Sequence, residues 1–504
     1  MALQKSQDMG YPKYMVFCAL VAAFSGFNVG WHISVPNMPQ GYITKCPPEG
    51  AGNGALPNCF PMSDGTWGFT VGAFPLGGLV GGLASMNLNN WFSRRTCILI
   101  SCGWFILGGV LSACAVNLYM YSVGRAFVGI GAGICGSSVA IYVSEISTIT
   151  ARGALGSLFE MYLNLGILFT QLFGLWLGNT PSWRVLWAIP TVLAAIQLAV
   201  ILFFTVETPR RLCGDKKYDA ACAALQKLRA GADVEEEFAH MLAARQRESE
   251  GHPRMNVFQV LFWKDKHVTW HAIIVMVLQA YNQVGGIGPM SVYSVGFLSN
   301  VLSNAPLATA ISLTDAGVNC IATLISLIFM RVVGRKGFML LSLGGTTLGC
   351  IFMVIGASVK DPANPTKLGP LVITACIVYT FSYSMGCGVI PWMIAPELLP
   401  MHALAAGSAL GSGSNWLFNF IINTIWPYMD SGMGSYSFIV FVAINFIGFV
   451  FVLFCMPETT GKDLDDDSDD KKKHDTLESG AAGSSQSSTK EKAHENVEHL
   501  ENAK

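Results

Sequence analysis

Long apolar runs, separated by short polar or charged stretches, restrict the fold of this chain more than any other feature. A helix needs roughly 20 apolar residues to cross the hydrocarbon core of a bilayer, and about twelve runs approach that length. Lipid cannot satisfy free backbone groups, so lipid-facing spans of this kind must be helical. The sequence therefore predicts an all-α membrane protein with twelve transmembrane helices. The runs lie near 14–36, 67–90, 97–116, 119–143, 155–178, 183–205, 269–298, 307–332, 339–358, 371–394, 403–426 and 437–455.

Composition agrees with a location in the lipid bilayer. Of the 504 residues, 52% are hydrophobic and only 12% are charged, whereas soluble domains carry about 25% charged residues. The net charge of -1 gives no overall field that would attract nucleic acid, so no such partner is expected. The first run is too long for a signal peptide and shows no evident cleavage site, so we expect it to remain as a helix.

Lysine and arginine gather in one set of loops, at Arg94, Arg95, Arg152, Arg335 and Lys336. By the positive-inside rule these loops are cytosolic, together with both termini and a charged middle segment. Six runs precede that segment and six follow it. We expect a cytosolic N-terminus (1–13), a six-helix half (14–206), a cytosolic helical linker (207–268), a second six-helix half (269–456) and a disordered, low-complexity tail (457–504).

The first outer loop contains two cysteines, Cys46 and Cys59, on either side of a Gly/Pro-rich stretch. An outer loop is exposed to an oxidising environment, so a disulfide between them is feasible. Two free thiols are the alternative.

The two halves repeat weakly in their inner loops. "WFSRR" (91–95) matches "VVGRK" (332–336), "VSEISTITARG" matches "APELLPMHALAAG", and "VETPR" matches "MPETTGK". Glu145 and Glu397 therefore occupy matching places, as do Glu207 and Glu458. Two repeated bundles with a site near the midplane are typical of carriers that work by alternating access.

The inner-loop charges are candidates for gating pairs. We expect them to tie helix ends together when the inner mouth is closed and to separate when it opens. Anchoring by the positive-inside rule alone would explain the cations but not the acids at matching places. The expected pairs join Arg94, Arg95 and Arg152 to Glu145 and Glu207 in one half, and Arg335 and Lys336 to Glu397 and Glu458 in the other.

Several segments in order resemble the sugar porters of the major facilitator superfamily, close to the facilitative glucose transporters: "GRAFVGIGAG", "YVSEIS", "RGALGSL", "ETPR", "LQAYNQVGGIG", "GVIPWMIAPEL", "GSNWLFNF" and "PETTGK". The resemblance covers most of the chain. It implies the major facilitator fold, alternating access and facilitated diffusion of a monosaccharide, above all a hexose. It implies no enzymatic activity, cofactor or metal, and its partners are the sugar and the lipid bilayer.

The resemblance also implies that the fifth, seventh, eighth, tenth and eleventh spans line the sugar site. The residue types agree, because sugar hydroxyls both donate and accept hydrogen bonds, as amides do. An indole such as that of Trp392 can stack on a sugar face and donate its N–H. Hydrogen bonds between helices and interfacial packing are the structural alternatives. The candidate substrate-binding residues are Glu160, Gln279, Asn282, Gln283, Asn319, Tyr383, Trp392, Asn415 and Trp416.

The chain departs from the family pattern within this site. Glu160 stands in place of a glutamine, Asn282 in place of the first amide of a glutamine pair, and Gly288 in place of an asparagine. Ser384, next to Tyr383, replaces a glutamate. Ordinary glucose selectivity therefore does not simply carry over.

His32 stands where uniporters of the family have asparagine and proton-coupled relatives have an aspartate paired with an arginine, here Arg125. Both side chains are bases, so we expect a neutral imidazole that hydrogen-bonds a neighbouring helix. Two intramembrane acids, Glu160 and Asp315, could instead exchange protons. Their structural alternatives are an ion pair with Arg125 for Glu160 and an exposed outer position for Asp315.

Facilitated diffusion is the favoured mechanism, and proton-coupled symport through Glu160 or Asp315 is the alternative. A transporter-like nutrient sensor is a lesser one, because the tail is short and low in complexity. The spans contain no paired metal motif, nucleophile elbow or phosphate loop that would indicate an enzyme. The plasma membrane is the expected location, with a vacuolar or endosomal membrane as the alternative.

Overall fold

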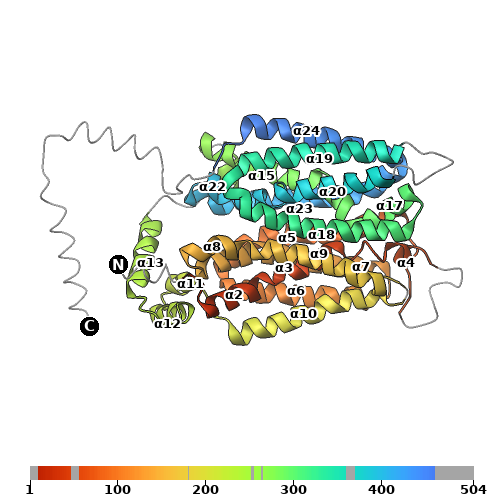
Figure 1. Cartoon of the computed structure of the whole chain (residues 1–504). Coiled ribbons are helices and arrows are strands. Elements are labelled where there is room, and N and C mark those ends of the chain that lie inside the picture. Colours follow the sequence, from red (N-terminus) through yellow and green to blue (C-terminus); the bar gives the residue numbers. More distant parts are fainter. Residues whose placement is uncertain are drawn as a thin grey trace, which may run out of the picture. The chain divides into compact units, whose positions relative to one another are not determined.

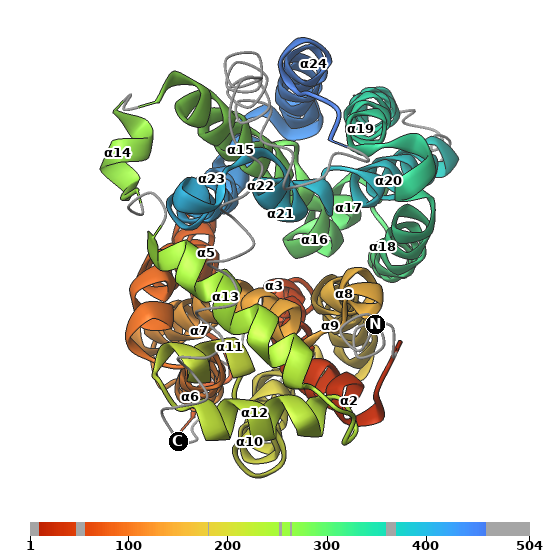
Figure 2. The ribbon, with the colours of Figure 1, turned by 90° about the vertical axis from the view of Figure 1, so that its left-hand side faces the viewer.

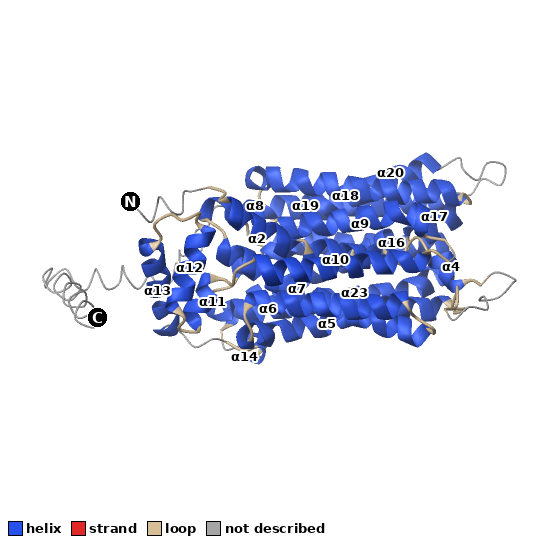
Figure 3. Cartoon of the chain, turned by 90° about the horizontal axis from the view of Figure 1, so that it is seen from below, coloured by secondary structure: helices blue, strands red, loops and turns tan. Residues whose placement is uncertain are grey.

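The structure, a computed structural model, describes residues 10–46, 56–179, 181–250, 255–262, 265–358 and 369–459. Within these ranges nearly every residue is helical and there is no strand (Figure 3). The predicted all-α class is therefore confirmed. Most of the expected disordered tail and the first nine residues lie outside the described ranges.

The helices follow the predicted runs closely (Figure 1). The first half contains α2 (Lys13–Ala23), α3 (Ser25–Ser34), α4 (Gln40–Thr44), α5 (Asp64–Trp91), α6 (Arg94–Ala113), α7 (Leu118–Ile146), α8 (Ile149–Gly156), α9 (Leu158–Leu177) and α10 (Trp183–Phe204). The middle segment contains α11 (Pro209–Gly214), α12 (Tyr218–Leu228), α13 (Glu235–Glu250) and α14 (Val257–Leu261). The second half contains α15 (Lys266–Val284), α16 (Ile287–Val292), α17 (Ser294–Leu302), α18 (Ala305–Val333), α19 (Arg335–Ser358), α20 (Gly369–Met385), α21 (Ile390–Met393), α22 (Ala395–Leu398), α23 (Met401–Met433), η1 (Gly434–Ser437) and α24 (Phe438–Cys455).

Ten helical segments of the described chain are long and apolar enough to cross a membrane. The predicted seventh and eleventh spans, α15 and α23, are not among them. These two helices carry the amides Gln279, Asn282, Gln283 and Asn415, which lower their hydropathy. Since both pack within the same compact unit as the other ten, the structure agrees with the predicted twelve-helix arrangement.

The helices gather in two groups, which follow the order of the chain (Figure 2). The groups meet where α5 lies beside α23 and where α9 lies beside α18. At the first contact Trp416 of α23 packs edge-on against Phe74 of α5, with 5.8 Å between ring centroids. At the second, Asn164 of α9 donates a hydrogen bond to Thr323 of α18 over 3.0 Å. The exact domain boundaries stay a prediction.

Glycines allow α3 and α9 to approach each other closely. A Cβ atom added at Gly30 would collide with the backbone carbonyl of Leu163, and one added at Gly166 would collide with that of Phe27. Small residues commonly bring membrane helices into such backbone contact. The Gly-rich character of the first span therefore reflects helix packing.

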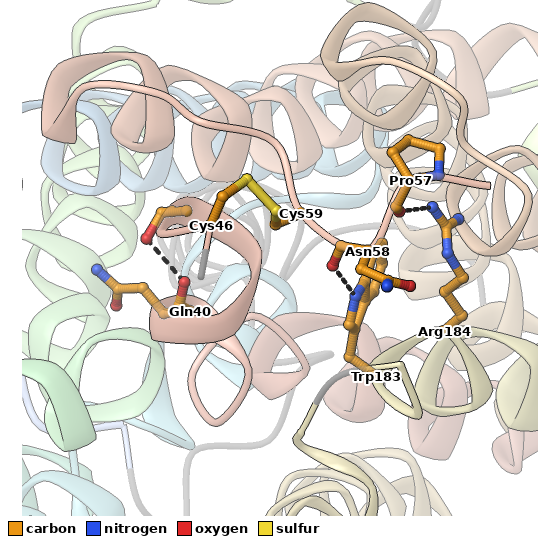
Figure 4. The surroundings of a disulfide bond; sticks show 8 residues. Gln40, Cys46, Pro57, Asn58, Cys59, Trp183 and Arg184 are labelled. Carbon is orange, nitrogen blue, oxygen red and sulfur yellow. Dashed lines mark hydrogen bonds between the residues drawn. A yellow bond between two sulfur atoms is a disulfide. The ribbon is translucent and has the colours of Figure 1, made fainter. Parts of the chain in front are cut away.

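The described ends of the predicted first outer loop lie beside the start of α10 (Figure 4). Cys46 and Cys59 form a disulfide, with 5.4 Å between their Cα atoms, so the alternative of two free thiols is not observed. Beside it, Trp183 donates to the carbonyl of Asn58 over 2.9 Å and Arg184 donates to that of Pro57 over 2.6 Å. The disulfide and these bonds hold this end of the loop against the bundle.

The middle segment docks on the first half at the predicted cytosolic end. Arg229 follows α12 and is buried, and it binds Glu237 through two hydrogen bonds of 2.7 and 3.1 Å. Its remaining nitrogen donates to the carbonyl of Ile146, at the end of α7, over 2.9 Å. The linker is therefore helical, as expected, and is fixed to the bundle by a satisfied buried ion pair.

Candidate functional site

A cluster of amides joins α15 to α23. Asn415 donates to the side-chain oxygens of Gln279 and Asn282 over 3.0 and 2.8 Å. Gln283 donates to the oxygens of Asn282 and Asn415 over 2.6 and 3.3 Å. Gln283 is the partly exposed member of this cluster and the other three are buried. The structure thus brings four predicted site residues together and leaves Gln283 accessible.

An interruption of the tenth span orients this cluster. The helix stops after Met385 and resumes as α21 at Ile390, with a turn between them. Outside continuous helix, carbonyl groups become free to accept other donors. Asn282 donates to the carbonyl of Cys387 over 2.6 Å, and Gln279 donates to that of Pro391 over 2.9 Å. The "GCGVIP" sequence therefore supplies acceptors that fix two of the amides.

A second polar group joins α18 to α20. Ser384 donates to the side-chain oxygen of Asn319 over 2.9 Å, and Thr380 donates to the carboxylate of Asp315 over 2.8 Å. Tyr383 donates to the backbone carbonyl of Asn282 over 3.0 Å, which links this group to the amide cluster. Asp315 is buried, so the expected exposed outer position is wrong for this residue.

The two candidate tryptophans lie in different surroundings. Trp392, in α21, remains 43% exposed, so its ring is available for contact. Trp416 is only 7% exposed, and its six-membered ring lies where a Cβ at Gly78 of α5 would be. This arrangement corresponds to the packing alternative for Trp416, and a sugar contact for either ring stays a prediction.

Glu160, near the start of α9, is partly exposed, and no hydrogen bond or ion pair reaches its carboxylate from the described residues. The expected alternative of an ion pair with Arg125 is wrong. Arg125 donates instead to the backbone carbonyls of His32 and Val71, over 2.6 and 3.2 Å. Glu160 lies close enough to Tyr383 to interact with it electrostatically.

His32 is completely buried among aromatic rings. Its ring centroid lies 5.6 Å from that of Trp187 and 6.1 Å from that of Phe105. Neither imidazole nitrogen has a hydrogen-bond partner among the described residues, so the expected side-chain hydrogen bond is wrong. The link to Arg125 runs through the backbone carbonyl alone, because the side chain faces aromatic groups.

Sequence reasoning missed a group of hydrogen bonds between the halves at their predicted outer ends, which we call the outer lock. Asn37 donates to Ser294 and Ser312 over 2.9 and 3.2 Å. Ser312 in turn donates to Gln171 of α9 over 2.7 Å. The sequence feature that could have indicated the outer lock is Asn37 itself, a polar residue between two prolines at the end of the first span.

Each half contains one of the expected inner ion pairs. Arg94 contacts Glu145 at 3.3 Å, and Arg335 contacts Glu397 at 2.9 Å. Both pairs join residues of the same half, so separation of the halves does not by itself require either pair to break. That they act as gates stays a prediction.

The other two acids bind backbone amides. Glu207 accepts from the backbone N–H of Arg95 over 3.3 Å, and Glu458 accepts from those of Arg335 and Lys336 over 3.0 and 3.1 Å. Each carboxylate thereby satisfies free N–H groups at the start of a helix, α6 or α19, where negative charge is favourable. The matching positions read from the sequence thus have the same local role.

Three predicted cations do not form the expected side-chain pairs in the described part of the chain. The Arg95 guanidinium donates to the carbonyl of Ile201 over 3.0 Å. Arg152 is exposed and Lys336 binds Glu458 through its backbone, and neither side chain has an ion pair there. The Arg95 guanidinium binds carbonyls at the end of α10 in place of a carboxylate, because the helix ends beside it.

Comparison with known proteins identifies the family of the chain. The family described as "Sugar (and other) transporter" matches residues 18–468. The facilitated glucose transporter member 3 of Oryctolagus cuniculus is 30% identical over 466 residues, which cover 90% of this chain and 91% of that protein. Member 5 of Homo sapiens is 27% identical over 459 residues, covering 89% and 90%.

Solved structures show the same fold. The xylose transporter XylE from E. coli, in a partially occluded inward-open conformation, superposes with a TM-score of 0.73 at 18% sequence identity. The superposition covers 90% of this chain and 100% of that chain. The proton:xylose symporter XylE bound to 6-bromo-6-deoxy-D-glucose gives a TM-score of 0.70 at 19% identity, with 90% and 98% covered. The expected major facilitator fold is confirmed.

Proposed function

Since the chain belongs to the sugar transporter family, a family of multi-pass membrane carriers and not of enzymes, we propose that it transports a hexose by facilitated diffusion. The plasma membrane is the proposed location, and both termini are proposed to be cytosolic. The similar mammalian proteins are described as facilitated glucose transporters, which supports a monosaccharide as the substrate.

The amide cluster on α15 and α23 is the observation that carries this proposal. Gln283 is partly exposed, and its amide both donates and accepts, as a sugar hydroxyl does. Its neighbours Gln279, Asn282 and Asn415 are held by hydrogen bonds to one another and to the interrupted tenth span. A site whose polar groups are already positioned loses little entropy when the ligand binds.

The outer lock supports alternating access. Asn37 and Gln171 of the first half reach Ser294 and Ser312 of the second half, so these ends are joined in the present conformation. The contrasting conformation would break these few neutral hydrogen bonds, each of which contributes only about 0.5–1.5 kcal/mol. Such a small contribution to the free-energy difference between the two conformations suits a reversible equilibrium between them.

Proton-coupled symport is a second candidate, favoured by one observation. Glu160 lacks a described partner and Asp315 has one carboxylate oxygen without a hydrogen bond. Unpaired intramembrane acids are common in proton pathways. The His32–Arg125 pair does not provide such a pathway, because it contains no acid.

Uptake of labelled sugars into cells that lack endogenous hexose transport tests the proposal. Cells expressing the chain should take up D-glucose or another hexose with saturation, and unlabelled hexose should compete. Cells expressing Asn415→Leu at equal surface level should lose most of this uptake, because leucine removes the amide that links Gln279 to Asn282. Expression at the cell surface without saturable uptake of any monosaccharide would refute the proposal.

A further inference from the structure

We propose that the first half binds one chloride ion, or an anion of similar size and charge, in a buried site between α5, α7 and α10. This site belongs to the first half, whereas the amide cluster lies on α15 and α23. Its proposed ligands are the indole of Trp187, the guanidinium of Arg125 and the hydroxyl of Tyr121. All three side chains are at most 1% exposed.

Arg125 carries a positive charge into the interior without an acid beside it. Among the described residues its guanidinium makes no ion pair. Its hydrogen bonds go to the neutral carbonyls of His32 and Val71, and its Nε finds no acceptor there. Its Cζ lies 4.9 Å from the ring centroid of Phe74 and 5.4 Å from that of Trp187. Carbonyls and aromatic faces attract a cation but leave its net charge in place, and a buried net charge is costly.

Hydrogen-bond donors without acceptors lie around this charge. The Nε1 atoms of Trp67 and Trp187 and the hydroxyl of Tyr121 are buried and have no hydrogen-bond partner in the described chain. Indole and guanidinium N–H groups can only donate, and a tyrosine hydroxyl can also donate. The group therefore requires an acceptor. An anion meets this requirement, and its hydrogen bonds are stronger than those of a neutral acceptor because they are charge-assisted.

The proposed ligands are close enough to share one ion. The ring centroid of Tyr121 lies 5.3 Å from that of Trp187, and the Cζ atom of Arg125 lies 5.4 Å from the same ring. A donor bonds its acceptor at about 3 Å, so donors about 6 Å apart can share one acceptor. Tyr121 and Arg125 are four residues apart on α7 and thus share a helix face. Trp67 stacks on Tyr121 with 6.5 Å between centroids, at the edge of the group.

The surroundings favour a small monovalent anion. The rings of Phe60 and Trp183 lie 6.3 and 6.1 Å from that of Tyr121, and such apolar neighbours add few polar ligands. A divalent anion such as sulfate would lose more hydration than the three donors could replace. Chloride has one charge, which matches the single guanidinium of Arg125, and one atom, which suits closely packed rings. A cation would be repelled by the same guanidinium.

The test begins with the purified full-length protein in potassium gluconate, whose anion is too large for an enclosed site. Replacing gluconate by chloride at constant ionic strength should raise Tm by at least about 2 °C, because a ligand of the folded state stabilises it. Equilibrium dialysis with radioactive chloride should show one bound ion per chain. Trp187→Phe keeps an aromatic ring but removes the N–H, and should weaken chloride binding about tenfold, the effect of one lost hydrogen bond.

Trp183→Phe is the matched control, because the N–H of Trp183 already donates to the carbonyl of Asn58. It should leave chloride affinity unchanged, whatever its effect on Tm. Tyr121→Phe is the second test variant and should weaken binding as Trp187→Phe does, so the inference stays testable if one of them fails to fold. Absence of bound chloride in the unaltered protein would overturn the inference and favour water as the acceptor. Equal chloride affinity in the control and both test variants would overturn it as well, since chloride would then act elsewhere on the protein.

Discussion

His32 illustrates how strongly the neighbours of a buried side chain decide its role. Its place in the family alignment suggested a polar partner, yet the structure surrounds the ring with Phe105 and Trp187 and leaves both nitrogens without a hydrogen bond. Aromatic contact is therefore the main interaction of this side chain. The sequence could not reveal it, because both aromatic residues come from other helices.

This assignment predicts the outcome of two substitutions. His32→Phe should preserve folding and transport, because it keeps an aromatic ring between Phe105 and Trp187. His32→Asn should lower stability by about 1–3 kcal/mol, because the smaller amide loses the contacts with both rings and leaves a cavity beside them. Thermal unfolding of the two purified variants in detergent measures the difference, and equal stability would contradict the aromatic role.

Gln283 is the residue through which we expect the amide cluster to contact the sugar. Gln283→Ala should raise the apparent KM about tenfold, the effect of one or two lost hydrogen bonds. Surface expression should be unchanged, because this side chain is partly exposed. Concentration-dependent uptake measures the change, with Gln226→Ala on the exposed face of α12 as the control. An unaltered KM would remove Gln283 from the site.

At the scale of helices, the interrupted tenth span and the charged helix ends have the clearest functional meaning. Hydropathy and the repeated loops were sufficient to place the helices and to find Arg94–Glu145 and Arg335–Glu397. They could not assign Glu207 and Glu458 to backbone amides, because a sequence shows charges but not which helix ends lie beside them.

The same limit applied to the candidate site. The amides of "LQAYNQ" were recognisable as candidate site residues, because polar groups within an apolar span are costly and usually have a function. The outer lock and the packing of Trp416 on α5 depend on which helices of the two halves face each other, and no local pattern contains that information.

The Arg335–Glu397 pair makes a prediction at this scale. Glu397→Lys should slow transport, because it places like charges together at the ends of α19 and α22. Adding Arg335→Glu should restore much of the rate by re-forming an ion pair of opposite polarity. Initial uptake rates of both single variants and the double variant give the coupling. Additive effects would show that the two residues do not act together.

For the molecule as a whole, the outer lock favours the conformation seen here. Asn37→Ala removes its bonds to Ser294 and Ser312 and should shift the population toward the outward-open form. Accessibility of a cysteine introduced at Thr170 to an impermeant thiol reagent measures this shift, with the exposed residue Tyr42 carrying the cysteine in a reference variant. Unchanged labelling at Thr170 would show that the lock does not control opening.

The proposed function depends on whether the sugar moves passively across the membrane. The most direct measurement is uptake of a labelled hexose into proteoliposomes containing the purified protein, with and without an imposed proton gradient. Facilitated diffusion predicts that internal sugar rises to the outside concentration and no further, and that a protonophore leaves the initial rate unchanged. Accumulation above the outside concentration that the protonophore abolishes would contradict facilitated diffusion and identify a proton symporter.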